Sequence, residues 1–441
     1  MTKRTFSNTL YTNDNLYVLL GMNSESVDLI YLDPPFNKNQ MFSAPIGSKA
    51  AGASFKDMWT WQDVDEYHLE TLADKFPALA RYIASVGAIH SKPMMAYLTY
   101  MAQRIVEMHR ILKDTGSLYL HCDPTASHYL KSLLDAIFGK NNFRNEITWY
   151  YRRWSAESNR FQRMHDIILF YGKSGKSIFN RLSIEPTEGQ KVKHERGYDR
   201  NSVLIDGKRQ PQLIIYNKQK VDKAVKAGKI NLKDYARTVL VEKGGTTMPD
   251  VWEIPILNSQ SKERTGYPTQ KPLALLKRII LASSNEDDVV LDPFCGCATT
   301  CVAAQQLGRR WIGIDLETNV VNILVDRLTD ASGVLFKDFI ATDQIPKRSD
   351  LKVVLPSQSV KERLYKEQQG KCNACGVEME IRHLEIDHIL PKAKGGGDYY
   401  ENYQLLCHTC NSIKGDRPME FLRIKIDTRA RLLKTQIIFG E

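Results

Sequence analysis

Two short proline-containing motifs, each directly after an apolar segment, constrain the fold of this chain more than any other feature. The first is Asp-Pro-Pro-Phe at residues 33–36, which follows the apolar segment 27–32. The second is Asp-Pro-Phe-Cys-Gly at residues 292–296, which follows the apolar segment 289–291. In an open α/β sheet, ligands bind at the carboxyl ends of the strands. We therefore expect the two motifs, although far apart in the chain, to meet at one site.

Alternating strand-like and helix-like stretches predict an α/β fold for most of the chain. Apolar residues at helical spacing predict a helix at 97–112, and an apolar run predicts a strand at 117–121. The alternation continues with helices at 127–138 and 273–283 and strands at 147–151, 167–171, 289–291 and 311–314. This order is typical of a mainly parallel sheet covered by helices.

Three segments interrupt this pattern. Residues 38–95 contain Trp59 and Trp61, and we expect loops over the site there, with both tryptophans packed rather than bound to a base. Residues 173–262 look irregular apart from a weak helix near 218–227. Residues 341–357 are polar, contain two prolines and predict a linker. The expected divisions are therefore 1–172, 173–262, 263–340, a linker at 341–357 and a C-terminal domain at 358–441.

The net charge of +10 is concentrated in the middle of the chain. Residues 173–264 hold 19 Lys and Arg against 11 Asp and Glu, a net charge of +8. A basic segment suits the phosphates of double-stranded DNA, although a solvated face is the commoner explanation of a charge run. The chain start lacks a signal-peptide core, and no run approaches the roughly 18 apolar residues of a membrane span. We expect a cytoplasmic protein that binds DNA and no membrane.

The second motif has the features of a cofactor site. Its turn follows a strand and opens a helix, Gly296 lets the backbone approach a ligand closely, and the first helical amides can receive a carboxylate. Asp315 ends the next strand about 20 residues on, where an acidic side chain can hold ribose hydroxyls. This order suits S-adenosylmethionine. The absence of a full Gly-x-Gly-x-x-Gly pattern argues against a dinucleotide.

The first motif suits an exocyclic base amine. The Asp33 carboxylate and the Pro34 carbonyl can accept its two N–H groups, which frees the nitrogen lone pair to attack a sulfonium methyl group. The prolines stiffen the turn, and Phe36 offers a stacking face for a base swung out of the duplex. Taken alone, a proline-rich turn without chemistry would be the better explanation. Together with the second motif, an amino-directed DNA methyltransferase is favoured.

The eight cysteines form two groups, of which one predicts a metal site. Cys372, Cys375, Cys407 and Cys410 make two Cys-x-x-Cys pairs, which in a cytosolic chain indicate zinc rather than disulfides. Four thiolates complete a closed tetrahedral site, whose zinc would be structural and coupled to folding. A zinc ribbon that only binds DNA or stabilises a fold would show the same four cysteines.

From residue 9 to about residue 330, the chain resembles the beta-arrangement amino-methyltransferases of bacterial modification systems. The matching stretches are 33–36, Gly-Tyr-Pro-Thr-Gln-Lys-Pro at 266–272 and Leu-Asp-Pro-Phe-Cys-Gly-Cys at 291–297. In that family, as here, the base motif precedes the donor motif. The resemblance implies a Rossmann-like, doubly wound α/β sheet with an inserted target-recognition region, and dimers are frequent in the family, so a homodimer is an open alternative.

The same resemblance implies roles for individual residues. Asp33, Pro34 and Phe36 would hold the base, with Asp at the first position and Phe at the last resembling enzymes of adenine N6 more than of cytosine N4. Ala298 stands where many relatives have glycine. The residues implied to contact S-adenosylmethionine are Asp14, Lys271, Asp292, Phe294, Gly296 and Asp315.

Residues 362 to about 417 resemble the HNH nuclease family. The resemblance rests on the adjacent Asp387 and His388, the glycines at 395–397, Asn402, and Asn411 directly after the last cysteine. It implies a small zinc-stabilised ββα-metal domain. His388 would be the general base on water, oriented by Asn402. Asp387 and Asn411 would bind a catalytic Mg²⁺ or Mn²⁺. Asn411 stands where many relatives have histidine.

These features predict a bifunctional restriction-modification protein, an adenine-N6 DNA methyltransferase joined to an HNH endonuclease. One alternative is a methyltransferase of adenine N6 or cytosine N4 whose zinc-stabilised tail only binds DNA. Another is a non-enzymatic DNA-binding protein with a relic site, which the intact motifs disfavour. The remaining histidines are expected to be ordinary packed or surface residues: His68, His90, His109, His121, His128, His165, His194, His383 and His408.

Overall fold

The computed structural model covers most of the chain. The residues it describes are 8–36, 40–45, 47–51, 54–57, 76–153, 159, 161–184, 188–241, 246–258, 260–332, 338–394, 396–417, 419, 422 and 425–426. Trp59, Trp61, His68 and Gly395 lie outside them. The chain forms two compact units, one of Met1–Phe179 with Asp250–Glu441 and one of Asn180–Pro249.

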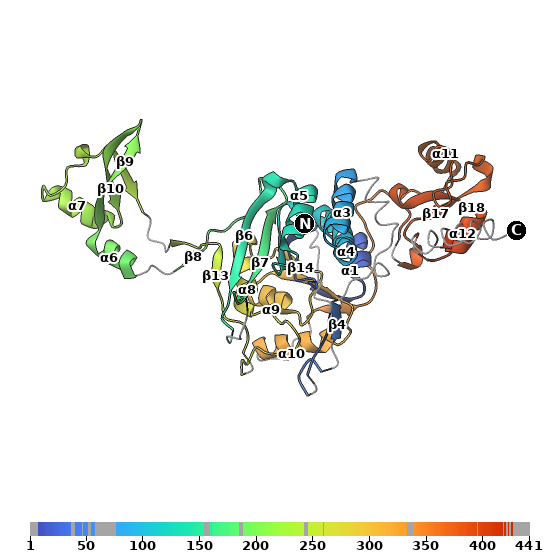
Figure 1. Cartoon of the computed structure of the whole chain (residues 1–441), viewed down its shortest axis with the longest axis horizontal. Helices are drawn as coiled ribbons and strands as arrows, with labels where there is room; N and C mark the ends of the chain where they lie inside the picture. The colour runs from blue at the N-terminus through green and yellow to red at the C-terminus, as the bar shows by residue number, and fades with distance from the viewer. Residues whose placement is uncertain are drawn as a thin grey trace. The chain divides into compact units, whose positions relative to one another are not determined.

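A nine-stranded sheet organises the larger unit, in the order β13-β6-β7-β5-β2-β14-β15-β1-β16 (Figure 1). Every pairing is parallel except the two that β7 makes with β5 and β6. The mainly parallel sheet expected from the sequence is therefore confirmed. Its strands are β1 (Thr9–Thr12), β2 (Val27–Leu32), β5 (Leu112–Cys122), β6 (Phe143–Tyr150), β7 (His165–Gly172), β13 (Val251–Glu253), β14 (Val289–Asp292), β15 (Arg310–Asp315) and β16 (Ile340–Thr342).

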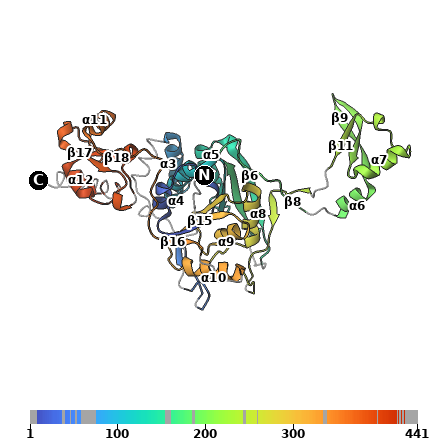
Figure 2. The same cartoon turned by 180° about the vertical axis from the view of Figure 1, so that it is seen from behind.

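Two groups of helices pack around this sheet (Figures 1 and 2). One group contains α1 (Asn15–Gly21), α3 (Pro77–Ile89), α4 (Lys92–Ile111) and α5 (Ser127–Phe138), and the other contains α8 (Leu273–Ser283), α9 (Thr299–Gln306) and α10 (Val320–Ser332). Buried Met101, Ile105 and Met108 form the apolar stripe of α4 that the spacing predicted. They join a continuous core with residues of β2, β5, β7 and β14.

The expectation of loops throughout residues 38–95 is wrong. A hairpin of β3 (Gln40–Ser43) and β4 (Ser54–Asp57) lies in this segment, and α3 follows it. Leu79, Ile83 and Val86 of α3 are buried. Their three-to-four-residue spacing is a helical signal that the length of the segment obscured.

The smaller unit is more regular than its sequence suggested. The strands β9 (Tyr198–Ile205) and β10 (Lys208–Ile215) form an antiparallel hairpin, and β11 (Arg237–Leu240) runs parallel to β10. The helix α6 (Glu188–Arg196) precedes them, and α7 (Lys218–Lys226) confirms the predicted weak helix. Asp206 and Gly207, both with positive φ, form the hairpin turn. An Asp-Gly pair between two runs is a strong hairpin signal, which the basic composition masked.

The C-terminal region has a small core of its own. The antiparallel β17 (Leu384–His388) and β18 (Tyr403–Cys407) precede α12 (His408–Lys414), which gives the expected ββα order. Leu364 of α11 (Gln358–Glu367) packs into this core.

The segment expected to be a plain linker begins as structure. At its start, β16 pairs with β1 and extends the large sheet. Further on, Ser349 N–H donates to Asn23 and Asp350 accepts from Ser24 N–H.

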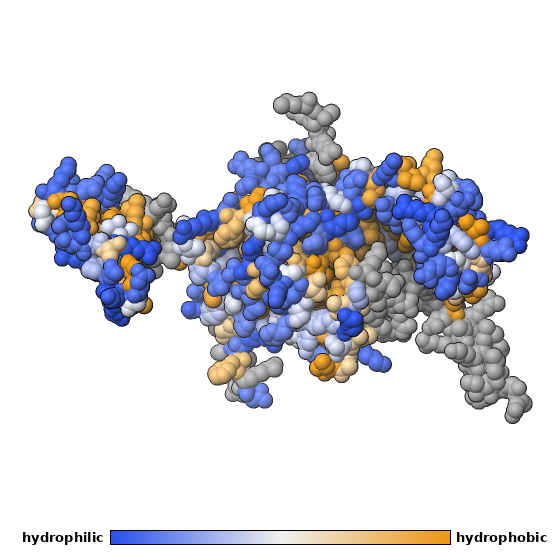
Figure 3. Space-filling view, turned by 90° about the horizontal axis from the view of Figure 1, so that it is seen from above, coloured by the Kyte–Doolittle hydropathy of each residue, from blue (hydrophilic) through white to orange (hydrophobic). Residues whose placement is uncertain are grey.

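No helix among the described residues is long and apolar enough to cross a membrane. The face in Figure 3 is mostly hydrophilic with scattered apolar patches.

Candidate active sites

The parallel pairing of β14 with β2 brings the two motifs together. Both motifs follow the carboxyl ends of these strands and line one cavity of about 360 Å³. The prediction that they meet is therefore confirmed. All of the residues predicted for the base and donor line this cavity: Asp14, Asp33, Pro34, Phe36, Lys271, Asp292, Phe294, Gly296 and Asp315.

The donor turn is held by Asp315 at the end of β15. One of its oxygens accepts the Gly296 N–H at 2.7 Å, and the other accepts the Glu317 N–H at 3.0 Å. Gly296 has a φ of +51°, and a Cβ there would come 3.0 Å from the Tyr267 ring. Burial raises the pKa of Asp315 to about 6. A carboxylate oxygen has two lone pairs, so Asp315 can hold the turn and still accept a ribose hydroxyl.

Asp292 fixes the start of α9 from inside. This buried carboxylate accepts hydrogen bonds from the Thr300 hydroxyl and, at 3.1 Å, from the Phe294 N–H. Burial is the main cause that raises the pKa of Asp292 to about 7. Asp292 therefore holds the backbone of the donor turn in place through these two hydrogen bonds.

Asp14 and its neighbours fasten α1 to the donor motif. Asp14 caps α1 by accepting the Leu16 N–H at 2.8 Å and forms a 3.0 Å ion pair with Arg104. Arg104 also bonds Asn15, whose side-chain amide donates to the Pro293 carbonyl at 2.8 Å. The Asp14 carboxylate is thus fixed in place where it lines the cavity.

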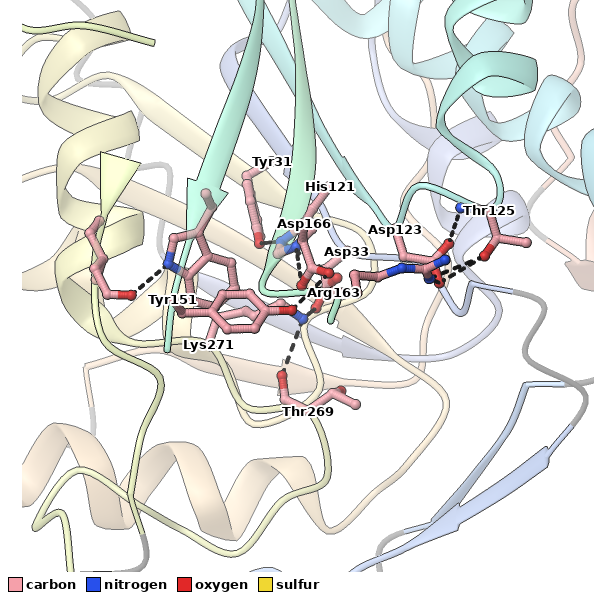
Figure 4. Close-up of polar contacts among 12 residues, drawn as sticks. Tyr31, Asp33, His121, Asp123, Thr125, Tyr151, Arg163, Asp166, Thr269 and Lys271 are labelled. Carbon is pink, nitrogen blue, oxygen red and sulfur yellow. Dashed lines mark hydrogen bonds and ion pairs between the residues drawn. The ribbon is translucent and has the colours of Figure 1, made fainter. Parts of the chain in front are cut away.

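Lys271 lies on the base side of the cavity (Figure 4). Its ammonium forms an ion pair with Asp33 Oδ2, donates to the Thr269 carbonyl at 3.2 Å, and lies 5.6 Å from the centre of the Phe36 ring. Lys271 also lines the cavity that holds the donor turn, so its implied contact with the donor stays a prediction. The ion pair forms because the negative charge of Asp33 attracts the nearby ammonium in a largely buried site.

His121 is a residue of the site that the sequence did not reveal. We had expected ordinary packing, but its fully buried ring joins Tyr31 OH (2.9 Å) to Asp166 (3.3 Å) beside Asp33 (Figure 4). Its ring also packs against Phe36. The signal was its position at the end of the predicted strand 117–121, the same sheet edge as the first motif.

The charge of Asp166 is set by this network. Burial alone would raise its pKa, but the hydrogen bond with His121 and the positive charge of Lys271 lower the pKa of Asp166 well below the ordinary value. The Tyr151 hydroxyl donates to the second Asp166 oxygen at 3.1 Å. Asp166 is therefore ionised and acts as the acceptor for both partners.

The four paired cysteines gather at one point in the C-terminal domain. Their sulfur atoms all lie within 4.8 Å of one another, and Cys372, Cys407 and Cys410 are buried. Zinc binds thiolates at about 2.3 Å in a tetrahedron, and four sulfurs this close fit around one ion. The donor set and its spacing therefore fit the predicted zinc.

His388 ends β17 and is oriented by Asp398. Its Nε2 lies 2.9 Å from Asp398 Oδ1, and Lys392 and Tyr403 also donate to that carboxylate, at 2.8 and 3.0 Å. Hydrogen bonds from Lys392 and His388 lower the pKa of Asp398 to about 2. Asp398 was missed by the sequence analysis, because its only sequence signal is an acidic residue after a glycine run.

Asn402 was expected to orient His388, but its side chain does something else. It accepts the Leu390 N–H at 2.8 Å and donates to the carbonyls of Leu390 and Gly397, at 3.0 and 3.1 Å. Asn402 therefore fixes the backbone of the loop that follows His388. The contact with the imidazole itself belongs to Asp398.

Asp387 and Asn411, the implied cation ligands, have different partners here. Asp387 accepts from Gln404 at 2.8 Å and is paired with the buried Lys414 ammonium at 3.0 Å. Asn411 donates to Glu385 at 2.6 Å. A cation at Asp387 would have to share this carboxylate with Lys414, so the arrangement does not fit the expected cation site as it stands.

Comparisons with known proteins match two separate parts of the chain. A DNA methylase family model matches residues 27–326, and an HNH endonuclease model matches residues 372–417. The type II methyltransferase M.EcaI of Enterobacter cloacae is 29% identical over 341 residues, covering 70% of this chain and 66% of that protein, slightly under two thirds of its length. The DNA adenine methyltransferase YhdJ of Escherichia coli (strain K12) is 27% identical over 355 residues, covering 79% of this chain and 93% of that protein.

Solved structures with a related outline include two methyltransferases. The crystal structure of the M1.HpyAVI–SAM complex covers 73% of this chain and 98% of its own, with 18% identity and a TM-score of 0.38. The cytosine-N4-specific PvuII DNA methyltransferase covers 77% of this chain and 96% of its own, with 12% identity and a TM-score of 0.40. Since the methylase model spans most of the chain and includes both cavity motifs, the chain belongs to the DNA methylase family, and it carries an HNH endonuclease domain over residues 372–417.

Proposed function

We propose that this protein transfers the methyl group of S-adenosylmethionine to adenine N6 within a specific DNA sequence. The observation that carries the proposal is the meeting of the Asp33 motif and the Gly296 turn in one cavity. The adenine assignment is supported by the Asp-Pro-Pro-Phe sequence and by the likeness to YhdJ, whose name describes an adenine methyltransferase.

The roles follow from the positions of the side chains. S-adenosylmethionine supplies a methyl group activated by a sulfonium. The backbone at Gly296 and the carboxylates of Asp14 and Asp315 offer acceptors and close approach on the donor side. Asp33 and the Pro34 carbonyl accept the amino hydrogens of the flipped base on the other side. Fixed acceptors of this kind orient the nitrogen for attack and need no covalent intermediate.

The HNH domain gives the protein its second proposed activity, cleavage of DNA. His388 is held by Asp398 in an orientation suited to a general base. The four-cysteine cluster would hold zinc and stabilise the fold around it. The alternative, a tail that only binds DNA, is supported by the pairing of Asp387 with Lys414, which occupies the carboxylate expected to bind Mg²⁺ or Mn²⁺.

The base assignment is tested by mass spectrometry of nucleosides. The full-length protein is incubated with S-adenosylmethionine and plasmid DNA from a methylation-deficient host, and N6-methyladenine is the expected product. Asp33→Ala should abolish transfer while calorimetry still detects donor binding. Asp114→Ala, which removes an exposed carboxylate paired with Lys176, is the control.

The outcomes separate the parts of this proposal. Only N4-methylcytosine in the product would overturn the adenine assignment and keep the methyltransferase. Full transfer by Asp33→Ala would overturn the role of the first motif. Loss of donor binding together with a lowered melting temperature would assign Asp33 to folding instead.

A further inference from the structure

One oxygen of the Asp33 carboxylate has no hydrogen bond in this structure. Oδ2 is paired with Lys271, whereas Oδ1 is buried and finds no donor among the described residues. His121 Nδ1 lies 3.8 Å from Oδ1. This distance is long for a hydrogen bond, but catalytic contacts are often long before substrate binds and tighten afterwards.

The partners of His121 define which of its nitrogens can accept a proton. Nε2 faces Asp166 Oδ2 at 3.3 Å, and an ionised carboxylate can only accept. Nε2 therefore carries a hydrogen that it donates to Asp166. Nδ1 faces Tyr31 OH at 2.9 Å. Burial raises the pKa of Tyr31 well above its ordinary value, so its hydroxyl stays protonated and donates. In the resting site the single lone pair of Nδ1 accepts this hydroxyl hydrogen. It can take a proton from Asp33 Oδ1, 3.8 Å away, once the Tyr31 hydroxyl turns its hydrogen elsewhere.

Methylation of an amino group releases a proton that must be taken up. The nitrogen lone pair forms the N–C bond, and the electrons of the broken C–S bond stay on sulfur, which becomes a neutral thioether. The nitrogen then carries the positive charge and loses one proton to the Asp33 carboxylate. That carboxyl group can pass the proton to a neighbouring base and return to its ionised form.

We propose that His121, backed by Asp166, is the base that receives this proton from Asp33. The step turns neutral His121 into an imidazolium between two carboxylates and restores Asp33 for the next base. Between turnovers the imidazolium returns the proton to water. His121 acts through Asp33 and does not touch the base. The inference rests on the proposed methyl transfer, and it holds for adenine and cytosine amines alike.

The test is the pH dependence of methyl transfer in a single turnover. Full-length protein is mixed with saturating S-adenosylmethionine and unmethylated plasmid DNA, without added divalent cations. The rate should rise with pH, because the base must be free to take up a proton. His121→Asn can still accept from Tyr31 but cannot take up a proton, so it should be at least roughly tenfold slower and lack this rise.

Other titrating groups near His121 must be separated from it. Tyr31 and Asp33 face it from β2 and the turn after it, Asp166 faces it from β7, and Lys271 reaches it through Asp33. Asp292 and Asp315 titrate on the donor side, with pKa values raised to about 7 and 6, mainly by burial. Saturating donor removes their effect on donor occupancy, and both are unchanged in His121→Asn.

A purely structural role is tested by Tyr119→Phe. Tyr119 lies on the same strand, is buried, and bonds Ser283 at 2.7 Å outside the cavity. This control loses a buried hydrogen bond and should keep both the rate and the pH profile. A second variant, Asp166→Asn, should move the rising part of the profile to lower pH, because the imidazolium loses its counter-charge.

The outcomes decide the proposal in either direction. Unchanged donor affinity with the pH-dependent rise lost in His121→Asn supports it, as does the shifted rise in Asp166→Asn if His121→Asn fails to fold. A wild-type profile in both variants overturns it. If the wild type transfers no methyl group to any DNA, the proposed function fails first, and this result is distinct from the others.

Discussion

Lys271 forms an ion pair with Asp33, 238 residues away in the chain, on the base side of the cavity. Both side chains are largely buried, at 8% and 16% exposed. The ammonium bonds the carboxylate that the amine of a flipped base is proposed to use. Binding of the base therefore requires Lys271 to share Asp33 or to move from it.

The first prediction concerns Lys271→Met, which keeps the length of the side chain and removes its charge. Because the lysine contacts Asp33 in this structure, turnover should fall by roughly tenfold or more while the donor dissociation constant changes little. Steady-state kinetics and calorimetry measure the two effects. Lys176→Met, at an exposed ion pair, is the control. A raised donor dissociation constant with unchanged turnover would instead assign Lys271 to the donor.

The second prediction concerns stability and pH. The folded-state pKa of Asp292 is raised to about 7 from 3.8, so the folded protein binds a proton that the unfolded chain releases. The stabilisation by this bound proton is complete at pH values below 3.8, the pKa of Asp292 in the unfolded chain. It is lost as the pH rises through about 7, the pKa in the folded protein. Asp315 shifts in the same direction. The free energy of unfolding should therefore fall between pH 5 and 7, by on the order of 1 kcal/mol per pH unit for Asp292.

Asp292→Asn should reduce this slope, since the amide does not titrate. Thermal melting of both proteins between pH 5 and 8 measures the difference. Equal slopes in the wild type and the variant would show that Asp292 is ionised throughout this range.

Local signals made part of the fold predictable. The helices α5 and α8 match the predicted ranges to the residue, because their apolar spacing is regular and Gly139 and Pro272 mark an end and a start. The shared cavity was predictable because both motifs follow strands, and ligands bind at the carboxyl ends of strands in an open α/β sheet. What sequence could not supply was register: Leu32 pairs with Leu120, so Asp33 and His121 follow side by side. No local pattern specifies that pairing.

The same limit explains the C-terminal domain. The cysteine spacing predicted the cluster, because two Cys-x-x-Cys pairs leave few other arrangements. The partner of His388 was missed, because Asp398 reaches it from a loop ten positions on. The pairing of Asp387 with Lys414 was missed for the same reason, since it depends on how α12 crosses β17.

The third prediction concerns Ala298, where many resembling sequences have glycine. Ala298 has a φ of +58° and ψ of 34°, a left-handed conformation that costs a Cβ-bearing residue about 1 kcal/mol relative to glycine. Ala298→Gly should therefore stabilise the protein or leave it neutral, with methyl transfer retained. Chemical denaturation measures the first effect. A clear loss of stability would mean that the Ala298 methyl group packs better than its backbone suggests.

The fourth prediction concerns the basic smaller unit. Lys208, Arg209, Lys226 and Lys233 are exposed there. Replacing all four with Gln should weaken DNA binding and reduce its salt dependence, by a log–log slope of roughly 0.9 for each lost phosphate contact. Asp222→Asn, which removes an exposed acidic group of α7, should not reduce the slope. An unchanged slope in the fourfold variant would place the DNA surface elsewhere.

The last prediction is that cutting and methylation can be separated. The side chain of His388 forms its hydrogen bond with Asp398 and not with a cysteine of the metal site. His388→Ala should therefore abolish cleavage, retain zinc and leave methyl transfer intact. Asp398→Asn should slow cleavage less severely, because it keeps an acceptor for the imidazole but not its charge. Cys375→Ser should lose zinc and unfold the domain, since four ligands close the site. Gel assays with Mg²⁺ or Mn²⁺ on methylated and unmethylated DNA, with zinc measured by mass spectrometry, follow each effect.

Two results would contradict the prediction: wild-type protein that cuts neither substrate, or His388→Ala that cuts normally. In either case the domain binds DNA without acting as a nuclease through His388. The pairing of Lys414 with Asp387 would then be the structural reason.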